Sequence, residues 1–394
     1  MDKNSKIYVA GHLGLVGSAI TAALKRKGYG NIIGRSFAEL DLRRQDDTEA
    51  FFAAEKPEAV ILCAAKVGGI MANNTLRAEF IYENLMIEAN VIHAAYLQGV
   101  KKLVFLGSSC IYPRDCPQPM KEDHLLTSPL EYTNEPYAIA KIAGLKMCEA
   151  YNLRYGTDFI AVMPTNLYGP NDNFNLTGGH VMPSLMRRIH LGKLLENDDF
   201  QGIRADLRRR PVDGFDGHED ETAILELLEN HGIHCTFNSQ LATPPEGGHS
   251  RNSQISVSVW GTGKPLREFM YSGDMADATV FIMEKVSFRD LISAGACKGS
   301  GAMDPGGMAE VRNTHINIGT GEEITIKDLS LLLKETTGFR GELVFDTGKP
   351  DGTPRKFLDS SKLHSLGFRH ATSLREGAKK MYDWYITDVK GKRQ

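Results

Sequence analysis

The sequence has no closely paired cysteines, no long apolar run and no excess of charge of one sign, and each absence excludes a class of protein. The six cysteines are scattered without a CxxC pair, so neither a disulfide framework nor a zinc site is expected, and no metal is predicted. No stretch is apolar for long enough to span a bilayer, and the polar start over residues 1–6 lacks the pattern of a signal peptide. We therefore expect a cytoplasmic protein with reduced thiols and no membrane partner.

The charge balance gives no sign of a polyanionic partner. The 394 residues include 46 Lys and Arg against 49 Asp and Glu, a formal net charge of -3. No global basic field favours nucleic acid, so local groups must hold any anionic ligand. The length is sufficient for two or three domains.

The first part of the chain alternates short apolar runs with helical patterns. The predicted strands cover residues 7–10, 32–34, 59–65, 102–107 and 158–163, and the helices between them include 16–27, 79–98 and 137–155. Nearly continuous apolar strands that alternate with helices indicate an α/β fold with a doubly wound parallel sheet of the Rossmann type.

The later part is more irregular and predicts a smaller α/β domain that binds substrate. Strands are expected at 257–261, 316–319 and 343–346, and helices at 275–285, 326–336 and 374–385. We expect the Rossmann domain over 1–170, with a later contribution near 255–285, and the smaller domain over 171–394. A charged, loop-rich insertion with one short helix near 223–230 is predicted over 195–254, and a mobile connection rich in Gly, Ala and Ser over 292–307.

A glycine-rich turn over 11–17 follows the first strand and opens a helix. Gly11 permits the tight turn, Gly14 removes the side chain that would hold a pyrophosphate away from the backbone, and Gly17 lets the helix pack close to the strand. Leu15 and Val16 open the helix, whose free N–H groups and dipole favour phosphate. The turn therefore predicts a dinucleotide site.

The end of the second strand favours one nicotinamide cofactor over the other. An acidic residue there would bind the ribose hydroxyls of NAD, whereas this chain has Arg35. A guanidinium pairs with a 2′-phosphate, so NADP(H) is the predicted cofactor. A solvated surface Arg is the alternative.

A Tyr and a Lys lie four residues apart on one predicted helix face, at Tyr137 and Lys141. An adjacent ammonium stabilises a phenolate whose ordinary pKa is about 10. Ser108 follows the strand at 102–107, where its hydroxyl can donate to a carbonyl oxygen. Together with the glycine-rich turn, these residues predict acid–base chemistry on a carbonyl.

The chain at this point resembles the extended short-chain dehydrogenase/reductases, and within them the GDP-L-fucose synthase family. The motifs that carry the resemblance lie in order at 64–70, 107–113, 134–141, 163–170, 267–269 and 349–356. The resemblance implies reduction of a GDP-4-keto-6-deoxy-D-mannose at C4, after epimerisation at C3 and C5, to give GDP-L-fucose.

The resemblance also implies the roles of individual residues. Ser108, Tyr137 and Lys141 serve the reduction, and Cys110 and His180 form the acid/base pair of the epimerisation. An ordinary thiol and imidazole, which ionise near ~8.5 and ~6.5, bracket neutral pH and suit alternating proton transfer.

Binding residues follow from the same resemblance. Beyond the glycine-rich turn and Arg35, the cofactor is expected at Ala64, Ala65, Lys66, Leu106, Gly107, Lys141, Pro164, Asn166, Leu167 and His180. The GDP-sugar substrate is expected at Ser109, Asn166, Arg188, Trp260, Arg267, Lys349 and Asp351. The helices that begin near residues 79 and 137 fit the four-helix contact of a homodimer.

Two features depart from the family pattern. His12 and Leu13 stand where members often carry an Arg for the 2′-phosphate, which leaves more of that task to Arg35. The insertion over 195–254 is hypothesised to be a lid or a subunit contact with Arg208, Arg209 and Arg210 near phosphate; a solvated excursion without a role is the alternative.

Other functions remain open from the sequence alone. The same chemistry could act on a related GDP-4-keto sugar such as a GDP-heptose. A nucleotide-sugar 4-epimerase with bound NAD and a non-catalytic Rossmann protein that senses NADP(H) are less favoured, the latter because Ser108, Tyr137 and Lys141 are all present.

Overall fold

The computed structural model describes residues 1–237, 253–293, 298–303 and 309–391. The chain forms two compact units. The first unit comprises Met1–Leu167, Glu268–Glu323 and Lys356–Thr372. The second comprises Tyr168–Arg267, Ile324–Arg355 and Ser373–Gln394. The chain therefore passes between the units more than once.

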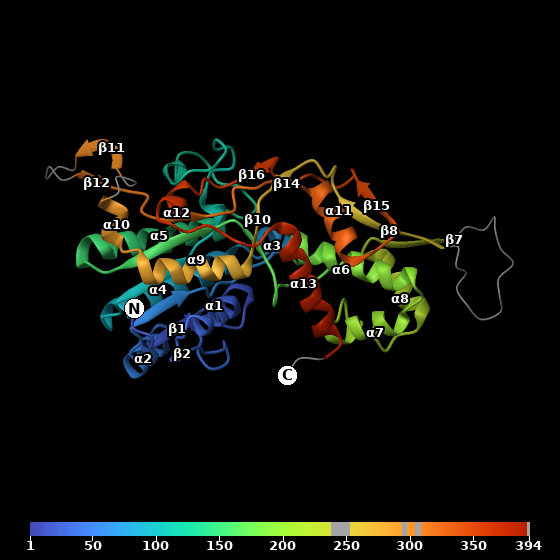
Figure 1. Cartoon of the computed structure of the whole chain (residues 1–394), viewed down its shortest axis with the longest axis horizontal. Helices are drawn as coiled ribbons and strands as arrows, with labels where there is room; N and C mark the ends of the chain where they lie inside the picture. The colour runs from blue at the N-terminus through green and yellow to red at the C-terminus, as the bar shows by residue number, and fades with distance from the viewer. Residues whose placement is uncertain (238–252, 294–297, 304–308, 392–394) are drawn as a thin grey trace. The chain divides into compact units, whose positions relative to one another are not determined.

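A six-stranded parallel sheet forms the centre of the first unit (Figure 1). Its order is β2-β1-β3-β4-β5-β13, made of β2 (Ile32–Ile33), β1 (Ile7–Ala10), β3 (Ala59–Leu62), β4 (Lys102–Leu106), β5 (Phe159–Pro164) and β13 (Ile316–Ile318). The residues of β1, β3, β4 and β5 are all buried, as their continuous apolar character predicts. The doubly wound α/β fold is confirmed.

Helices cover both faces of this sheet. Ile7 and Val9 face α1 (Leu15–Arg26) and α9 (Ser272–Lys285), whereas Tyr8 and Ala10 share a core with α2 (Gln45–Glu55), α4 (Arg77–Leu97) and α5 (Glu135–Tyr155). Alternate residues of a strand point to opposite faces, so one strand contributes to both cores. Within the two layers α1 packs against α9 and α4 against α5 (Figure 1).

The strand order reverses at the centre of the sheet, between β1 and β3. Ligands of open α/β sheets bind at the carboxyl ends of the strands beside such a switch point. The glycine-rich turn follows β1, and the loop that begins at Cys63 follows β3. The topology thus brings these two loops to one edge.

Shorter elements complete the first unit. They are α3 (Ile70–Thr75), η1 (Ser109–Ile111), η2 (Glu122–His124), the paired β6 (Asn166–Tyr168) and β10 (Phe269–Tyr271), α10 (Phe288–Ser293), the antiparallel β11 (Lys298–Met303) and β12 (Ala309–Val311), and α12 (Ser361–Ser365). Within the connection expected over 292–307, residues 298–303 form a strand, and 294–297 and 304–307 lie outside the described residues.

The second unit is built on a three-stranded sheet. In it β8 (Ser253–Trp260) pairs in parallel with β15 (Glu342–Asp346) and antiparallel with β7 (Ile233–Phe237). A second small sheet has the order β14-β9-β16, from β14 (Ile324–Thr325), β9 (Leu266–Arg267) and β16 (Arg355–Lys356). The helices are α6 (Val181–Glu196), α7 (Phe200–Arg209), α8 (Glu221–Asn230), α11 (Ile326–Thr337) and α13 (Leu374–Val389).

The insertion over 195–254 is more ordered than its composition predicts. Instead of one short helix it forms α7, α8 and β7, while 238–252 lies outside the described residues. Asp199 and Asp220 cap the two helices by accepting from the N–H groups of Gly202 and Ala223. The helix expected near 223–230 is present as α8, whereas α7 was missed because its charged residues mask an amphipathic helix, in which Leu207 is buried.

Candidate active site

The glycine-rich turn has the backbone that a pyrophosphate requires. Gly11 has φ +83, and a Cβ at Gly17 would lie 2.1 Å from the Gly11 carbonyl oxygen, so a side chain is excluded there. A Cβ at Gly14 would meet only that oxygen, at 3.6 Å, which leaves open space in front of α1. No side chain caps this helix and its first turn has no acidic residue. The N–H groups of Leu15 and Val16 lie in that first turn, so the cradle fits an anion.

Arg35 and His12, the two residues considered for binding a 2′-phosphate, lie near the end of β2. Arg35 donates to Glu55 Oε1 at 2.6 Å and to the Gly34 carbonyl at 2.9 Å. The His12 ring packs against Gly34, where a Cβ would lie 2.5 Å from Nδ1. His12 therefore stands beside the Arg35 backbone, and Arg35 is already held by a carboxylate.

The loop after β3 is fixed by a residue that sequence reasoning missed. Asn84 of α4 accepts from the Lys66 N–H at 2.9 Å and donates to the Lys66 carbonyl at 3.1 Å. Asn84 is fully buried. It therefore holds the backbone that follows the predicted cofactor residues Ala64 and Ala65.

The predicted reductase residues meet at the carboxyl end of β4. Ser108, which follows Leu106 and Gly107, caps η1 with its side chain and accepts from the Cys110 N–H at 3.2 Å. Burial raises the pKa of Tyr137 most strongly, and Cys110 and Glu88 act in the same direction. The Ser108 hydroxyl opposes them by hydrogen bonding to the phenol oxygen. The phenol is therefore held in its protonated form.

Lys141 is buried beneath this site and has two polar partners. Its ammonium donates to the Leu106 carbonyl at 3.1 Å and lies 3.0 Å from Glu88 Oε1. It also lies 5.7 Å from the centre of the Tyr137 ring. A buried ion pair of this kind is stable only if both partners are held in place. Glu88 was not predicted, although a Glu amid the apolar residues of a helix is a signal that could have found it.

Cys110 lies between an ammonium and an amide. Lys356 Nζ is 3.2 Å and Asn134 Nδ2 is 3.3 Å from its sulfur. Both donors belong to motifs of the resemblance, yet neither was predicted as a site residue. The sulfur is therefore contacted by one charged and one neutral donor. The neighbouring Ser109 is buried.

The segment after β5 is tied to a buried carboxylate. Pro164 ends β5, and Asn166 and Leu167 begin β6. Asn166 donates to the Glu268 carbonyl at 2.8 Å, and the Glu268 side chain accepts from the N–H groups of Thr320 and Leu358. Glu268 thus connects three separate stretches of the first unit, a structural role that the sequence did not reveal.

In the second unit His180 precedes α6 and faces Asp172. His180 Nδ1 lies 3.7 Å from Asp172 Oδ1, and the His180 side chain is half exposed whereas Asp172 is buried. The nearby Asp172 carboxylate raises the pKa of His180 and outweighs burial, which lowers it. The imidazole is therefore biased toward the charged, proton-donating form.

Three predicted substrate residues meet around an exposed indole. The Arg188 guanidinium lies 5.7 Å and the Lys349 ammonium 5.5 Å from the centre of the Trp260 ring, which is 52% exposed. Arg188 donates to the Leu176 carbonyl, and its buried Nε has no hydrogen-bond partner among the described residues. An open aromatic face between two cations suits a base and an adjacent diphosphate.

Arg267 ends β9, and Asp351 lies in the loop between β15 and β16 of the same unit. Arg267 donates to the Thr353 carbonyl at 2.6 Å, and Asp351 accepts from the Thr262 N–H at 2.8 Å and from its hydroxyl at 2.7 Å. Burial lowers the pKa of Arg267, and Asp351 partly opposes this. Both are therefore oriented by backbone contacts.

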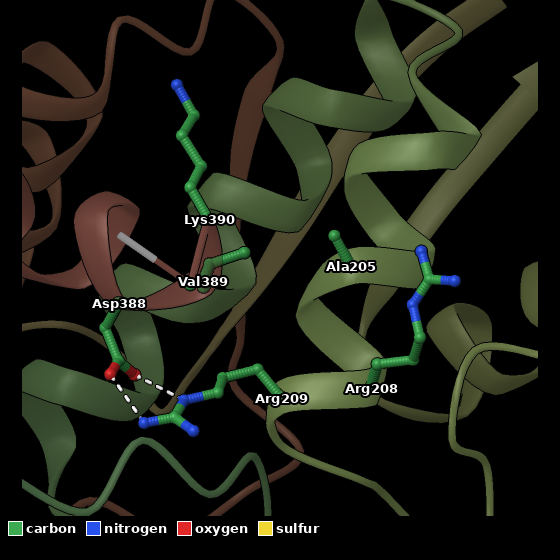
Figure 2. Close-up of a pocket in the computed structure, with 7 residues that line it drawn as sticks. Ala205, Arg208, Arg209, Asp388, Val389 and Lys390 are labelled. Atoms are coloured by element: carbon green, nitrogen blue, oxygen red, sulfur yellow. Dashed lines mark hydrogen bonds and ion pairs between the residues drawn. The ribbon is translucent and has the colours of Figure 1, made fainter. Parts of the chain in front are cut away.

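The three consecutive arginines of the insertion, at residues 208–210, lie in the second unit, and two of them form ion pairs there. Arg209 donates to both Asp388 oxygens and Arg210 to one of them. Arg208, Arg209, Asp388 and Lys390 line a surface pocket (Figure 2). Two of the three cations that were hypothesised to lie near phosphate therefore share one carboxylate of α13. They fasten the end of α7 to that helix.

The fold and these side chains define a class of enzyme. A parallel Rossmann sheet, an open glycine-rich turn at its switch point, and a Tyr–Lys pair beside a Ser are the parts of a short-chain dehydrogenase/reductase. No group of three His, Cys, Asp or Glu in the described ranges is arranged to hold a metal ion. Among the same residues no helix is long and apolar enough to cross a membrane.

Comparison with known proteins places the chain within this class. Residues 7–205 and 240–292 match the NAD dependent epimerase/dehydratase family. GDP-L-fucose synthase 1 of Arabidopsis thaliana is 47% identical over 388 residues, which cover 98% of this chain and 95% of that protein. GDP-L-fucose synthase of Escherichia coli is 41% identical over 381 residues, 97% of this chain and 96% of that one.

A solved structure agrees with these relatives. A GDP-D-glycero-L-gluco-heptose synthase from Campylobacter jejuni, determined in the presence of NADPH, is 40% identical with a TM-score of 0.82 and covers 98% of this chain and 99% of that one. The chain belongs to the NAD dependent epimerase/dehydratase family, and within it to the GDP-L-fucose synthases.

Proposed function

We propose that the protein converts GDP-4-keto-6-deoxy-D-mannose to GDP-L-fucose with NADPH, by epimerisation at C3 and C5 followed by reduction at C4. The observation that carries the proposal is the cluster in the first unit of Tyr137, Lys141 and Ser108 with Cys110, since it combines a proton donor for reduction with a thiol for epimerisation. The resemblance to GDP-L-fucose synthases over nearly the whole chain supports the substrate.

The reduction requires a proton at the C4 oxygen. NADPH, when bound, supplies a hydride. Tyr137, whose pKa is raised chiefly by burial, is held as a phenol and donates the proton. Ser108 donates a hydrogen bond to the same oxygen, and Lys141 contacts the nicotinamide ribose. Tyr137 then recovers a proton from solvent.

The epimerisation requires a base on one face of the sugar carbon and an acid on the other. Cys110, with Lys356 beside its sulfur, removes the α-proton, and His180, whose pKa is raised by Asp172, returns one on the opposite face. Ser108 and Tyr137 stabilise the enolate oxygen by hydrogen bonding. One oxyanion site thereby serves both reactions.

The cofactor fits the residues present. The open cradle over 11–17 receives the pyrophosphate, and Arg35 with His12 receives the 2′-phosphate. The rest of the cofactor is proposed to contact Ala64, Ala65, Lys66, Leu106, Gly107, Pro164, Asn166, Leu167 and His180. In this arrangement Arg35 supplies the preference for NADPH.

The substrate nucleotide is proposed to bind on the second unit. Trp260 stacks on the guanine base, and Arg188, Lys349 and Arg267 contact the diphosphate. Asp351, in the loop after β15, is a further proposed contact of the substrate, and Ser109 and Asn166 of the first unit contact the hexose. The cations are held by backbone carbonyls before substrate binds, which limits the entropy that is lost on binding.

A coupled assay tests the function directly. The purified protein is mixed with GDP-4-keto-6-deoxy-D-mannose and NADPH, loss of the nicotinamide absorbance is followed, and the sugar is identified. One NADPH consumed for each GDP-L-fucose formed is expected. NADPH loss that gives a sugar not inverted at C3 and C5 would remove the roles of Cys110 and His180.

A related GDP-4-keto-heptose is the second candidate substrate. The observation that favours it is the similarity to the Campylobacter jejuni heptose synthase, which is 40% identical over 98% of this chain and 99% of that one. Competition between the two GDP-sugars, measured as kcat/KM for each, decides between them. A 4-epimerase with bound NAD would consume no NADPH in either assay.

We also propose a homodimer in the cytoplasm. Exposed apolar side chains on α4 and α5, which include Tyr82, Leu97, Leu153 and Tyr155, form a surface suited to a four-helix contact, and Tyr155 stacks on Tyr96 at 4.3 Å between ring centres. Light scattering would give the mass of two chains. Five cysteines of the described residues are free thiols, which suits a reducing compartment.

A further inference from the structure

The loop over 172–180 contains both members of the pair formed by Asp172 and His180, and α7 of the insertion contacts this loop. Within the second unit, α7 packs against α6 and against α13 (Figure 1). The proposed mechanism does not use α7. Its buried side chains nevertheless connect directly to the loop that carries the epimerisation acid.

Asp206 of α7 and Arg187 of α6 form an ion pair in the interior of the second unit. Their side chains are 0% and 1% exposed, and Arg187 Nη2 lies 2.7 Å from Asp206 Oδ1. Arg187 Nε donates to the same oxygen at 2.8 Å, and the Tyr385 hydroxyl donates to Asp206 Oδ2. A buried guanidinium is costly unless a partner compensates its charge, so Asp206 determines where Arg187 lies.

Arg187 also donates to two backbone carbonyls. Nη1 donates to the Phe174 carbonyl at 3.2 Å, and Nη2 donates to the Arg210 carbonyl. Phe174 is buried and lies within the loop over 172–180, two residues after Asp172. The ion pair with the insertion therefore extends, through one guanidinium, to the backbone of this loop.

A second contact joins α7 to the same part of the loop. The Arg210 guanidinium lies 5.2 Å from the centre of the Phe174 ring and donates to Asp388 of α13. The Phe174 ring is also stacked on Trp384 of α13, with 5.9 Å between ring centres. These contacts restrict the position of the Phe174 side chain as the hydrogen bond from Arg187 restricts its backbone.

We propose that Asp206 is a positioning residue for the epimerisation, because through Arg187 it holds the loop that carries His180. This inference rests on the proposed function, in which His180 returns a proton to the sugar carbon. In that step the His180 N–H bond breaks, a C–H bond forms at the enolate carbon, and the imidazole is left neutral. A displacement of the acid by about 1 Å can cost about 10²-fold in rate. The insertion thereby supports the reaction without contacting the substrate.

The pKa of His180 provides a readout that needs no substrate. Among the described residues, Asp172 is the charged group that acts on the imidazole, and it raises the pKa whereas burial lowers it. The charge of Asp206 is compensated by Arg187. A lower pKa of His180 in an Asp206 variant therefore reports that the imidazole and the Asp172 carboxylate have moved apart.

The test is an NMR titration of the His180 imidazole in the full-length protein without ligands. The resonance is assigned by its loss in His180→Gln. In Asp206→Asn the pKa of His180 is expected to fall, because Arg187 loses its charged partner and the loop is released. An unchanged or higher pKa would overturn the proposal.

Arg209→Met is the matched control for this titration. It removes an ion pair between α7 and Asp388 of α13 (Figure 2) but keeps Asp206 and Arg187. The pKa of His180 is expected to stay at the wild-type value. An equal fall in Arg209→Met and in Asp206→Asn would mean that any loosening of α7 has this effect, and the specific role of Asp206 would be overturned.

A second variant keeps the test decisive if Asp206→Asn does not fold. The double variant Arg187→Met with Asp206→Leu replaces both charges of the pair by apolar side chains, which proteins often tolerate. It leaves no unpaired charge at this position but removes the donor to the Phe174 carbonyl. The same fall in the pKa of His180 is expected. A folded double variant that titrates like wild type would overturn the proposal.

The rate of epimerisation is the second readout. Deuterium uptake from D₂O at C3 and C5 of GDP-4-keto-6-deoxy-D-mannose, at saturating substrate, is expected to fall about tenfold or more in both Asp206 variants and to stay unchanged in Arg209→Met. Wild-type uptake in the Asp206 variants would overturn the role in epimerisation. If wild type takes up no deuterium into this sugar but the titration shifts as expected, the proposed function fails and the positioning of His180 by Asp206 stands.

Discussion

The ammonium of Lys356 lies 3.2 Å from the sulfur of Cys110. The two residues are far apart in the sequence, yet both belong to the first unit. The contact supplies the thiol with a positive neighbour at the position where the proposed epimerisation needs a base, since the thiolate is the form that accepts a proton.

Replacing Lys356 by Met is expected to slow epimerisation about tenfold or more, because Cys110 loses the ammonium that contacts its sulfur. Cys110→Ser should cost about 10²- to 10⁴-fold. Deuterium uptake from D₂O at C3 and C5 measures this step by itself. Lys101→Met, at an exposed ion pair with Glu58, is the control. Equal uptake in Lys356→Met and wild type would contradict the role of the contact.

Tyr137→Phe removes the proposed proton donor and is expected to lower NADPH oxidation by about 10²- to 10⁴-fold. The affinity for NADPH, measured by fluorescence titration, should change little because the ring remains. Tyr82→Phe on exposed α4 surface should keep full activity. A Tyr137→Phe enzyme with more than a tenth of wild-type turnover would show that another group donates the proton.

The pH profile of epimerisation should depend on Asp172. The nearby carboxylate of Asp172 raises the pKa of His180, so the charged imidazole persists to higher pH than in free histidine. In Asp172→Asn, the part of the pH–rate profile that reports the ionisation of His180 is expected at lower pH. NMR titration of the imidazole should show the same decrease in its pKa. A limb that stays in place would mean that it reports a different group.

Cofactor preference should depend on Arg35. Arg35→Ala is expected to weaken NADPH binding about ten- to hundredfold, which corresponds to the loss of one charge-assisted hydrogen bond. NADH binding is expected to stay nearly unchanged. Fluorescence titration with both cofactors measures the ratio. Arg26→Ala, in an exposed pair with Asp277, serves as control. Equal losses for NADPH and NADH would indicate damage to the fold of β2 instead.

Acid stability should depend on Glu284, which contacts Lys3 and Tyr29. Burial acts to raise the pKa of Glu284, but hydrogen bonds from Lys3 and Tyr29 outweigh it and lower the pKa to about 2. Because the folded pKa is depressed, the stabilisation is present above the unfolded value near 4.5 and is lost as pH falls toward 2.

Glu284→Gln is therefore expected to lower the free energy of unfolding by about 1–3 kcal/mol at pH 7 and by less at pH 3. Urea unfolding at both pH values measures the difference. Glu335→Gln, at an exposed ion pair with Arg375 of the second unit, should have little effect at either pH. A Glu284→Gln loss that is the same at pH 3 and pH 7 would argue for a packing defect.

The sequence predicted the local features of the first unit well, because they depend on residues that are neighbours in the chain. The sheet strands follow from apolar runs, and the turn at Gly11, Gly14 and Gly17 follows from backbone sterics. The contacts of Glu88, Glu268 and Lys356 join segments that are remote in sequence, and no periodicity reports such pairings. In the insertion, the charged residues of α7 hid the pattern of a buried helix. Asp206 of α7, for example, is buried in an ion pair with Arg187 of α6.

The order of the sheet has a consequence for biosynthesis. During synthesis, β5 (Phe159–Pro164) leaves the ribosome long before β13 (Ile316–Ile318). β13 is the edge strand of the sheet and the parallel partner of β5. Until residue 318 has emerged, β5 presents an open strand edge, which is a template for aggregation. Chains that terminate before this point are expected to depend on chaperones and to be degraded, although they contain the whole glycine-rich turn and the Tyr–Lys pair.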